Sequence, residues 1–197
     1  FFAELIRELE GQKKYIGGGE ESYGFLPGDY VRDKDAVASC ALVAEIAAWA
    51  KSRGKTLYEL LIDIYLEYGL YREKLINIVR KGAEGAGEIK AMMKGYRTNP
   101  PKTINNSKVL KINDYDTLIL TDCLTGRRTK IDLLKSDVLQ FFLEDGSKIS
   151  VRPSGTEPKI KFYFSVNTTL NSVSAFDETE KRLDERIQGI IADMKLA

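Results

Sequence analysis

A stretch reading RPSGTEPK, in the last third of the sequence, combines the groups that bind a phosphate. Arg152 offers a planar fork of N–H donors, and Gly155 allows the backbone to approach a ligand closely. Ser154 and Thr156 add hydroxyl groups, and Lys159 adds a second cation. Successive backbone N–H groups in such a turn can form an anion-binding nest. The stretch predicts a phosphate site without Walker-loop spacing, and the alternative is a solvated turn with two surface charges.

A second stretch, GGGEESYG, indicates different chemistry. Glu20 and Glu21 repel a phosphate but accept hydrogen bonds from neutral hydroxyls, in which sugars are rich. Ser22 both donates and accepts, and the flanking glycines, including Gly24, permit tight backbone turns. We therefore predict a sugar-binding loop. The alternative is an acidic surface loop in which Ser22 only caps a turn.

Lys34 follows this loop, between Asp33 and Asp35. A partly desolvated lysine at this place would serve as a proton-transfer group or as a phosphate donor. A lysine between two aspartates is more often a surface ion pair of small energetic weight. Both interpretations stay open from the residues alone.

The composition narrows the class of protein. The 197 residues carry 30 Lys and Arg against 29 Asp and Glu, a net charge of +1, so no global field would recruit nucleic acid or a membrane surface. Cys40 and Cys123 have no metal-ligand spacing, which favours a cytoplasmic protein without a disulfide framework. Histidine is absent, which leaves Lys, Glu, Asp, Tyr and Cys for proton transfer. The first ten residues have the apolar spacing of a helix interior, so we take the chain to be a piece of a longer protein.

The elements that must position these loops are helices first and strands later. The sequence predicts helices over 1–10, 35–53 and 57–68, the second capped by Asp33 or Asp35 and the third by a Thr56/Glu59 capping box. A strand over 71–79 and a glycine-rich hinge over 82–87 follow.

The rest of the chain predicts a small α+β domain. A short helix is expected over 88–97, with Met93 facing inward, and strands are expected in the region 108–166. Asp145-Gly146 marks a hairpin, and a last helix, expected over 177–195, buries Ile187 and Met194 among other apolar residues. We predict two domains, 1–81 and 82–197.

Together these motifs resemble the α-D-phosphohexomutase superfamily, the phosphoglucomutases and phosphomannomutases. The stretch from Gly19 to Ser22 resembles the family's sugar-recognition loop, and RPSGTEPK resembles its phosphate loop. The similarity covers nearly the whole chain, and two further stretches resemble the branch that also contains phosphopentomutases: Val31-Arg32-Asp33-Lys34-Asp35 and Leu66-Glu67-Tyr68-Gly69. The resemblance implies the C-terminal part of a third, α/β domain and a complete fourth, α+β domain with a fold like the TATA-binding protein.

The resemblance also implies roles for particular residues. Glu20 and Ser22, with Glu21 less directly, would bind sugar hydroxyls. The phosphate that is not reacting would be held by Arg152, Ser154, Gly155, Thr156 and Lys159. Lys34 matches a lysine near the substrate in some members. Where other members have a His two residues after the sugar-loop serine, this chain has Gly24, so Lys34 is the candidate acid/base.

The family reaction further implies a phosphoserine in a first domain, Mg²⁺ in a second, and a hexose 1,6-bisphosphate intermediate. The resemblance implies a hexose phosphate as the ligand. Neither of those two domains is recognisable in this sequence, so we expect the missing N-terminal domains as partners and no catalysis by the chain alone. The alternatives are a phosphopentomutase, a non-catalytic sugar-phosphate-binding module, and a structural fragment that dimerises through its truncated domain.

Overall fold

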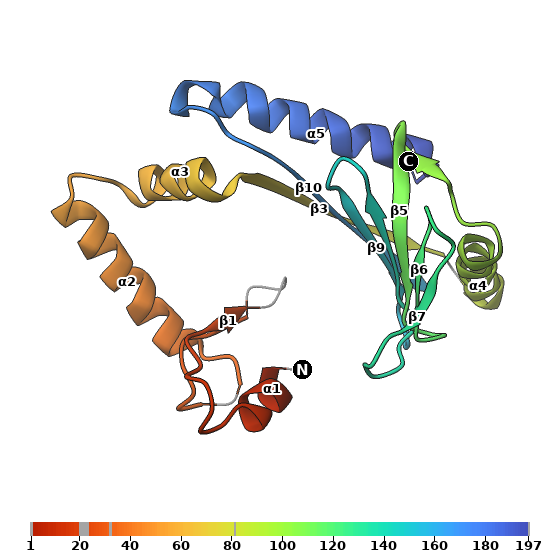
Figure 1. The fold of residues 1–197 in the computed structure, drawn as a ribbon, viewed down its shortest axis with the longest axis horizontal. Coiled ribbons are helices and arrows are strands. Elements are labelled where there is room, and N and C mark those ends of the chain that lie inside the picture. Colours follow the sequence, from red (N-terminus) through yellow and green to blue (C-terminus); the bar gives the residue numbers. More distant parts are fainter. Residues whose placement is uncertain (1, 20–23, 32, 81, 197) are drawn as a thin grey trace. The chain divides into compact units, whose positions relative to one another are not determined.

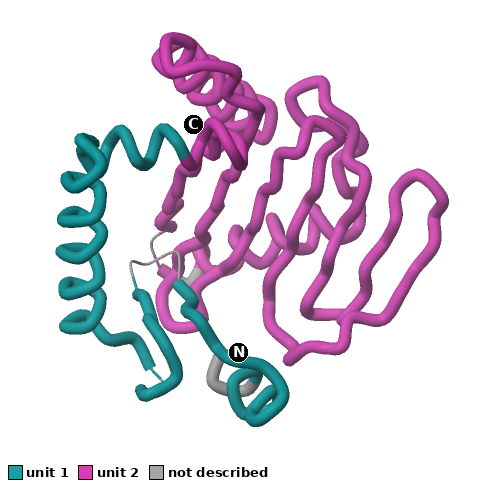
Figure 2. Tube along the Cα trace, turned by 60° about the vertical axis from the view of Figure 1, so that its left-hand side comes forward, with its two compact units in different colours: residues 1–63 teal, residues 64–197 magenta. Residues whose placement is uncertain are grey.

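The chain forms two compact units in a computed structural model that describes residues 2–19, 24–31, 33–80 and 82–196. One unit comprises residues 1–63 and the other residues 64–197, as Figure 2 shows in teal and magenta. The domain boundary expected between residues 81 and 82 stays a prediction. No helix in the described ranges is long and apolar enough to cross a membrane.

The first unit is mainly helical. Helix α1 spans Phe2–Glu8 and α2 spans Ala36–Ser52, while the strands β1 (Gly18–Gly19) and β2 (Phe25–Leu26) pair antiparallel. Asp35 is the residue that caps α2, because its carboxylate accepts a hydrogen bond of 3.0 Å from the Ala38 amide.

The capping box predicted for α3 (Leu57–Tyr68) is confirmed. The Thr56 amide donates to Glu59 Oε2 at 2.7 Å, and the Glu59 amide donates to Thr56 Oγ1 at 3.2 Å. The helix ends at Gly69, which has φ +95°. A Cβ there would lie 3.1 Å from the Thr168 carbonyl oxygen, so glycine lets the chain turn directly into the first strand of the next sheet.

The second unit contains an eight-stranded antiparallel sheet (Figure 1). Its order is β3-β10-β9-β8-β5-β6-β7, with β4 paired to β5 off this path. The strands span β3 Leu70–Val79, β4 Thr103–Ile104, β5 Ser107–Asp114, β6 Ile119–Asp122, β7 Arg128–Lys130, β8 Leu139–Leu143, β9 Lys148–Pro153 and β10 Lys159–Thr168. The hairpin predicted at Asp145-Gly146 joins β8 to β9.

One face of the sheet carries the core. Along β10 the alternate residues Ile160, Phe162, Phe164 and Val166 are all buried. Helix α5 (Phe176–Asp193) follows the short 3₁₀ helix η1 (Val173–Ala175) and lies along β3 and β10 in Figure 1. It buries Leu183, Ile187, Ile190 and Ile191, as the spacing predicts. Met194, which we expected inside, is the C-cap residue and is only half-buried.

The predicted glycine hinge is wrong, because residues 82–87 are the first turns of helix α4 (Gly82–Thr98). Met93 of this helix is buried, and Tyr96 packs edge-on against Phe141 and Phe162. At Gly85 the missing side chain serves close packing, since a Cβ there would lie 2.5 Å from the Arg80 Cβ.

Candidate functional site

The phosphate-loop candidate joins β9 to β10 as a tight turn. The Ser154 amide donates to the Lys159 carbonyl oxygen at 2.8 Å, and the Lys159 amide donates to the Glu157 carbonyl oxygen at 2.7 Å. Ser154 Oγ accepts from the amides of Thr156 and Glu157 at 3.4 and 3.3 Å. The serine hydroxyl thus holds the shape of the turn, which the sequence alone did not indicate.

Packing against the described part of the protein does not explain why residue 155 is a glycine. A Cβ at this position would meet nothing within 4 Å, and the residue is exposed. Thr156 beside it is also exposed. An open, small residue at the tip of the turn leaves the backbone accessible to a ligand, as an anion-binding turn requires.

Two cations lie side by side at the base of the loop. Arg152 in β9 and Lys161 in β10 are directly opposite in the strand register. Directly opposed residues in antiparallel strands point to the same face, and here that face is the one opposite the buried Ile160 and Phe162. No described residue forms an ion pair with Arg152 or Lys161, although Lys161 is close enough to Glu157 for its charge to contribute to the lowered pKa of that carboxyl.

Lys161 was absent from our predicted site. The period-two alternation of β10 places it on the open face, and only the pairing of β9 with β10 shows that it lies beside Arg152. Lys159, which we did predict, forms an ion pair with Glu157. The Lys159 ammonium lowers the pKa of Glu157 through a hydrogen bond and charge attraction. Arg152 and Lys161 are therefore the two cations that the strand pairing brings together at the base of the loop.

The sugar-loop candidates Glu20, Glu21 and Ser22 lie outside the described residues. The two short strands that flank them pair with each other, Gly19 opposite Phe25. A Cβ at Gly17 would lie 3.2 Å from Phe25 Cζ, and a Cβ at Gly19 would lie 3.3 Å from Phe25 Cδ2. Glycines before the loop thus let the backbone lie against this ring, and the sugar-binding role stays a prediction.

Lys34 forms an ion pair with its neighbour. Its Nζ lies 3.1 Å from Asp33 Oδ1, and its amide donates to the same oxygen at 2.7 Å. These bonds, with the amide bond contributing most, lower the pKa of Asp33. The Lys34 side chain is 51% exposed, so the pair fits the surface alternative that the sequence left open. A role for Lys34 as acid/base stays a prediction.

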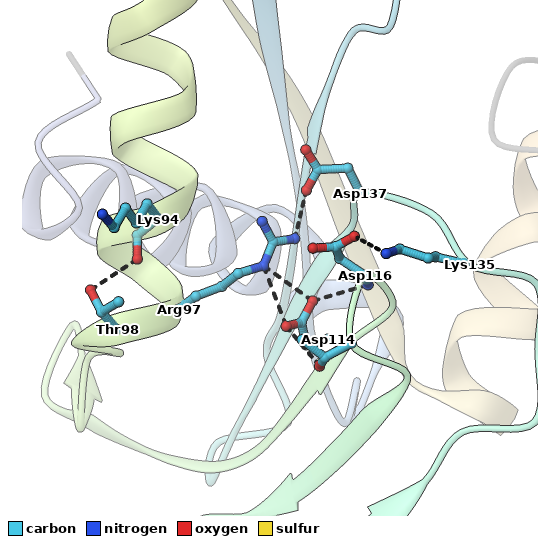
Figure 3. Close-up of polar contacts among 8 residues, drawn as sticks. Lys94, Arg97, Thr98, Asp114, Asp116, Lys135 and Asp137 are labelled. Atoms are coloured by element: carbon cyan, nitrogen blue, oxygen red, sulfur yellow. Dashed lines mark hydrogen bonds and ion pairs between the residues drawn. The ribbon is translucent and has the colours of Figure 1, made fainter.

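A second charged cluster lies in the same unit and is structural. Figure 3 shows Arg97 reaching from α4 to Asp114 and Asp137, and Lys135 pairing with Asp116. Burial lowers the pKa of Arg97, but pairing with Asp137 and Asp114 outweighs burial and raises it. Each carboxylate of the cluster has a cation within reach, so the cluster ties α4 to the ends of β5 and β8.

A divalent cation has no evident place in the described ranges, since they bring no three His, Cys, Asp or Glu side chains together as a metal site. The described residues therefore do not fit a Mg²⁺ centre.

Comparison with known proteins identifies the family. The model of the phosphoglucomutase/phosphomannomutase α/β/α domain III matches residues 1–68, and the model of the phosphoglucomutase/phosphomannomutase C-terminal domain matches residues 75–182. The chain belongs to the phosphoglucomutase/phosphomannomutase family. The predicted fold class, the C-terminal part of an α/β domain III followed by an α+β domain IV, is confirmed, and the structure adds that the sheet is antiparallel.

Individual relatives agree with this assignment. A phosphoglucomutase of Staphylococcus haemolyticus (strain JCSC1435) is 40% identical over 165 residues, which are 84% of this chain and 30% of the relative. One of Staphylococcus aureus (strain MRSA252) is 37% identical over 187 residues, 95% of this chain and 33% of the relative. The chain thus spans about a third of the length of these relatives.

A solved structure has a similar fold. It is the open form of the exocytosis-sensitive phosphoprotein pp63/parafusin, a phosphoglucomutase from Paramecium. The TM-score is 0.54 at 15% identity, and the match covers 95% of this chain and 33% of that one.

Proposed function

We propose that this chain supplies the sugar and phosphate recognition of a phosphohexomutase that interconverts hexose 1-phosphate and hexose 6-phosphate. The observation that carries the proposal is the pair of cations Arg152 and Lys161, which lie opposite each other at the base of an open turn and form no ion pair with a described residue. The relatives named phosphoglucomutase support a hexose rather than a pentose phosphate as the substrate.

The role of the loop is to hold the phosphate that does not react. Phosphoryl transfer depends mainly on positioning and on charge stabilisation. A dianion bound by the Arg152 fork and by the backbone at the exposed Gly155 would place the opposite end of the sugar at the reacting group. Glu20 and Ser22 would orient the sugar hydroxyls, and Glu21 would contribute to the same loop.

The remaining parts of the reaction belong to the proposed longer parent protein. We propose that its other domains provide a phosphoserine and a Mg²⁺ site, and that hexose 1,6-bisphosphate is the intermediate. The ion would supply charge stabilisation of the transferring phosphoryl group. Lys34 is our candidate for proton transfer. We place the parent protein in the cytoplasm.

Self-association of the isolated chain also stays a proposal. Helix α2 leaves large apolar side chains exposed in the structure, among them Val37, Val43 and Trp49. Their spacing of six residues puts them on different sides of the helix, and a helix that is apolar on several sides is typical of one that other protein segments cover. Either the domains that complete the parent or a second copy of the chain would bury it.

An activity comparison tests the proposed function. The purified 197-residue chain and a longer protein that includes the upstream domains are assayed for interconversion of glucose 1-phosphate and glucose 6-phosphate. We expect turnover by the longer protein and none by the chain alone, since the phosphoryl donor is proposed to lie upstream. Turnover by a chain preparation free of contaminating mutase would overturn the division of roles.

A further inference from the structure

The end of β3 and the next residue, Arg80, lie directly against the phosphate loop. The Arg80 amide, one residue beyond β3, donates to the Pro158 carbonyl oxygen at 2.9 Å. Val79 is opposite Lys159 in the register of β3 and β10. The last residues of the loop are therefore held on their β3 side by the backbone of Arg80.

Arg80 is in turn packed against Gly85 in the first turns of α4. An ideal Cβ on Gly85 would lie 2.5 Å from the Arg80 Cβ, 2.6 Å from its carbonyl carbon and 2.9 Å from its carbonyl oxygen. Two of these three atoms belong to the backbone, so a side chain at Gly85 cannot be accommodated by a rotamer change alone. It must displace the Arg80 backbone.

A displacement of Arg80 reaches the loop through hydrogen bonds. The Arg80 amide donates a hydrogen bond to the Pro158 carbonyl oxygen. The residue after Pro158 is Lys159, whose carbonyl oxygen accepts the hydrogen bond from the Ser154 amide that closes the turn. Ser154 Oγ in turn accepts hydrogen bonds from the Thr156 and Glu157 amides, which shape the tip of the loop. A short chain of contacts therefore runs from Gly85 to the groups proposed to bind the phosphate.

We propose that Gly85 is a positioning residue for the phosphate loop, acting through Arg80 and Pro158. The inference rests on the proposed function, because it assumes that the loop binds phosphate. It adds that the first turn of α4 sets the loop geometry, and that a glycine is required there for close approach rather than for flexibility.

The same helix provides a matched control. A Cβ at Gly87 would meet nothing within 4 Å, and the same holds at Gly95. Gly87→Ala therefore makes the same chemical change in the same helix without touching Arg80, and alanine is the better helix former. A general effect of glycine replacement in α4 would appear in both variants.

The experiment measures binding of inorganic phosphate to the whole 197-residue chain by titration of backbone amide NMR shifts. We expect Gly87→Ala to bind like the wild type and Gly85→Ala to bind at least about tenfold more weakly, since the loss of one hydrogen bond to a charged ligand costs about that much affinity. Without phosphate, the Gly85→Ala shifts should change at Ser154 and Lys159 while those of the β8–β9 hairpin remain. A loss of stability alone would not produce this localised pattern in a folded protein.

The outcomes separate the two claims. Equal affinity of the wild type and Gly85→Ala would overturn the positioning role and leave the phosphate site intact. No phosphate binding by the wild type would overturn the proposed site and the positioning role with it. If Gly85→Ala does not fold, amide hydrogen exchange in the wild type tests whether Arg80 is coupled to the phosphate loop. Phosphate should slow exchange of the Arg80 amide but not of the Gly95 amide. Unchanged exchange at Arg80 would refute the positioning role.

Discussion

Replacement of Arg152 by alanine should weaken phosphate binding by a defined amount. Arg152 is exposed and forms no ion pair with a described residue, so its removal leaves no described carboxylate without its cation. Hydrogen bonds to a charged group contribute about 1.5–3 kcal/mol, which corresponds to a loss of roughly 10- to 150-fold in affinity. Lys161, directly opposite, remains and should keep the loss within this range.

Isothermal titration with inorganic phosphate and with glucose 6-phosphate measures the change. Arg152→Lys keeps the charge but loses the planar fork, so its affinity should lie between those of the wild type and the alanine variant. Arg128→Ala is the matched control, because Arg128 is an exposed arginine of β7, separated from β9 by three strands in the sheet order. If Arg152→Ala bound both ligands as tightly as Arg128→Ala does, the assignment of the loop would be refuted.

Two further predictions concern charges in the second unit. Arg97→Ala leaves Asp114, whose side chain is only 14% exposed, without its cation. This variant should lower the free energy of unfolding by about 1–3 kcal/mol in urea titrations. Lys135→Ala removes a cation from an exposed pair and should cost less than about 1 kcal/mol, so equal costs of the two variants would contradict the structural role of the cluster. Arg72 holds the pKa of Asp184 below its ordinary value of 3.8, chiefly by hydrogen bonding, so this pair stabilises the fold above about pH 4 and the contribution is lost as the pH falls further. Asp184→Asn should therefore lower the free energy of unfolding by up to about 1 kcal/mol at pH 7, and a difference from the wild type that did not shrink below about pH 4 would argue against the pair.

The elements that the sequence predicts well are those with local causes. The capping box at Thr56 and Glu59 involves residues three positions apart, and the alternation from Ile160 to Val166 directly reflects a strand with one buried face. The start of α4 was missed because its glycines have low helix propensity and suggested a hinge. The contact of Gly85 with Arg80 depends on how the chain turns from β3 into the helix, which residue types alone do not reveal.

The candidate site likewise contains residues that a local motif indicates and residues that only the fold brings together. Arg152, Ser154 and Gly155 lie within four consecutive residues, so a motif was enough to indicate them. Lys161 joins Arg152 only through the pairing of β9 with β10, and the ion pair of Lys159 with Glu157 depends on the shape of the turn. Long-range register and side-chain pairing therefore decided which of the cations are available, and neither can be read from spacing.

Backbone amide NMR of the 197-residue chain, titrated with inorganic phosphate and with glucose 6-phosphate, tests the central claim most directly. We expect both ligands to shift the amides of Ser154, Gly155 and Thr156, and only the sugar phosphate to shift those of Glu20 and Ser22. This result would show that the chain holds both recognition loops of a sugar-phosphate site. Unchanged amides in the phosphate loop at millimolar concentrations of either ligand would contradict the account.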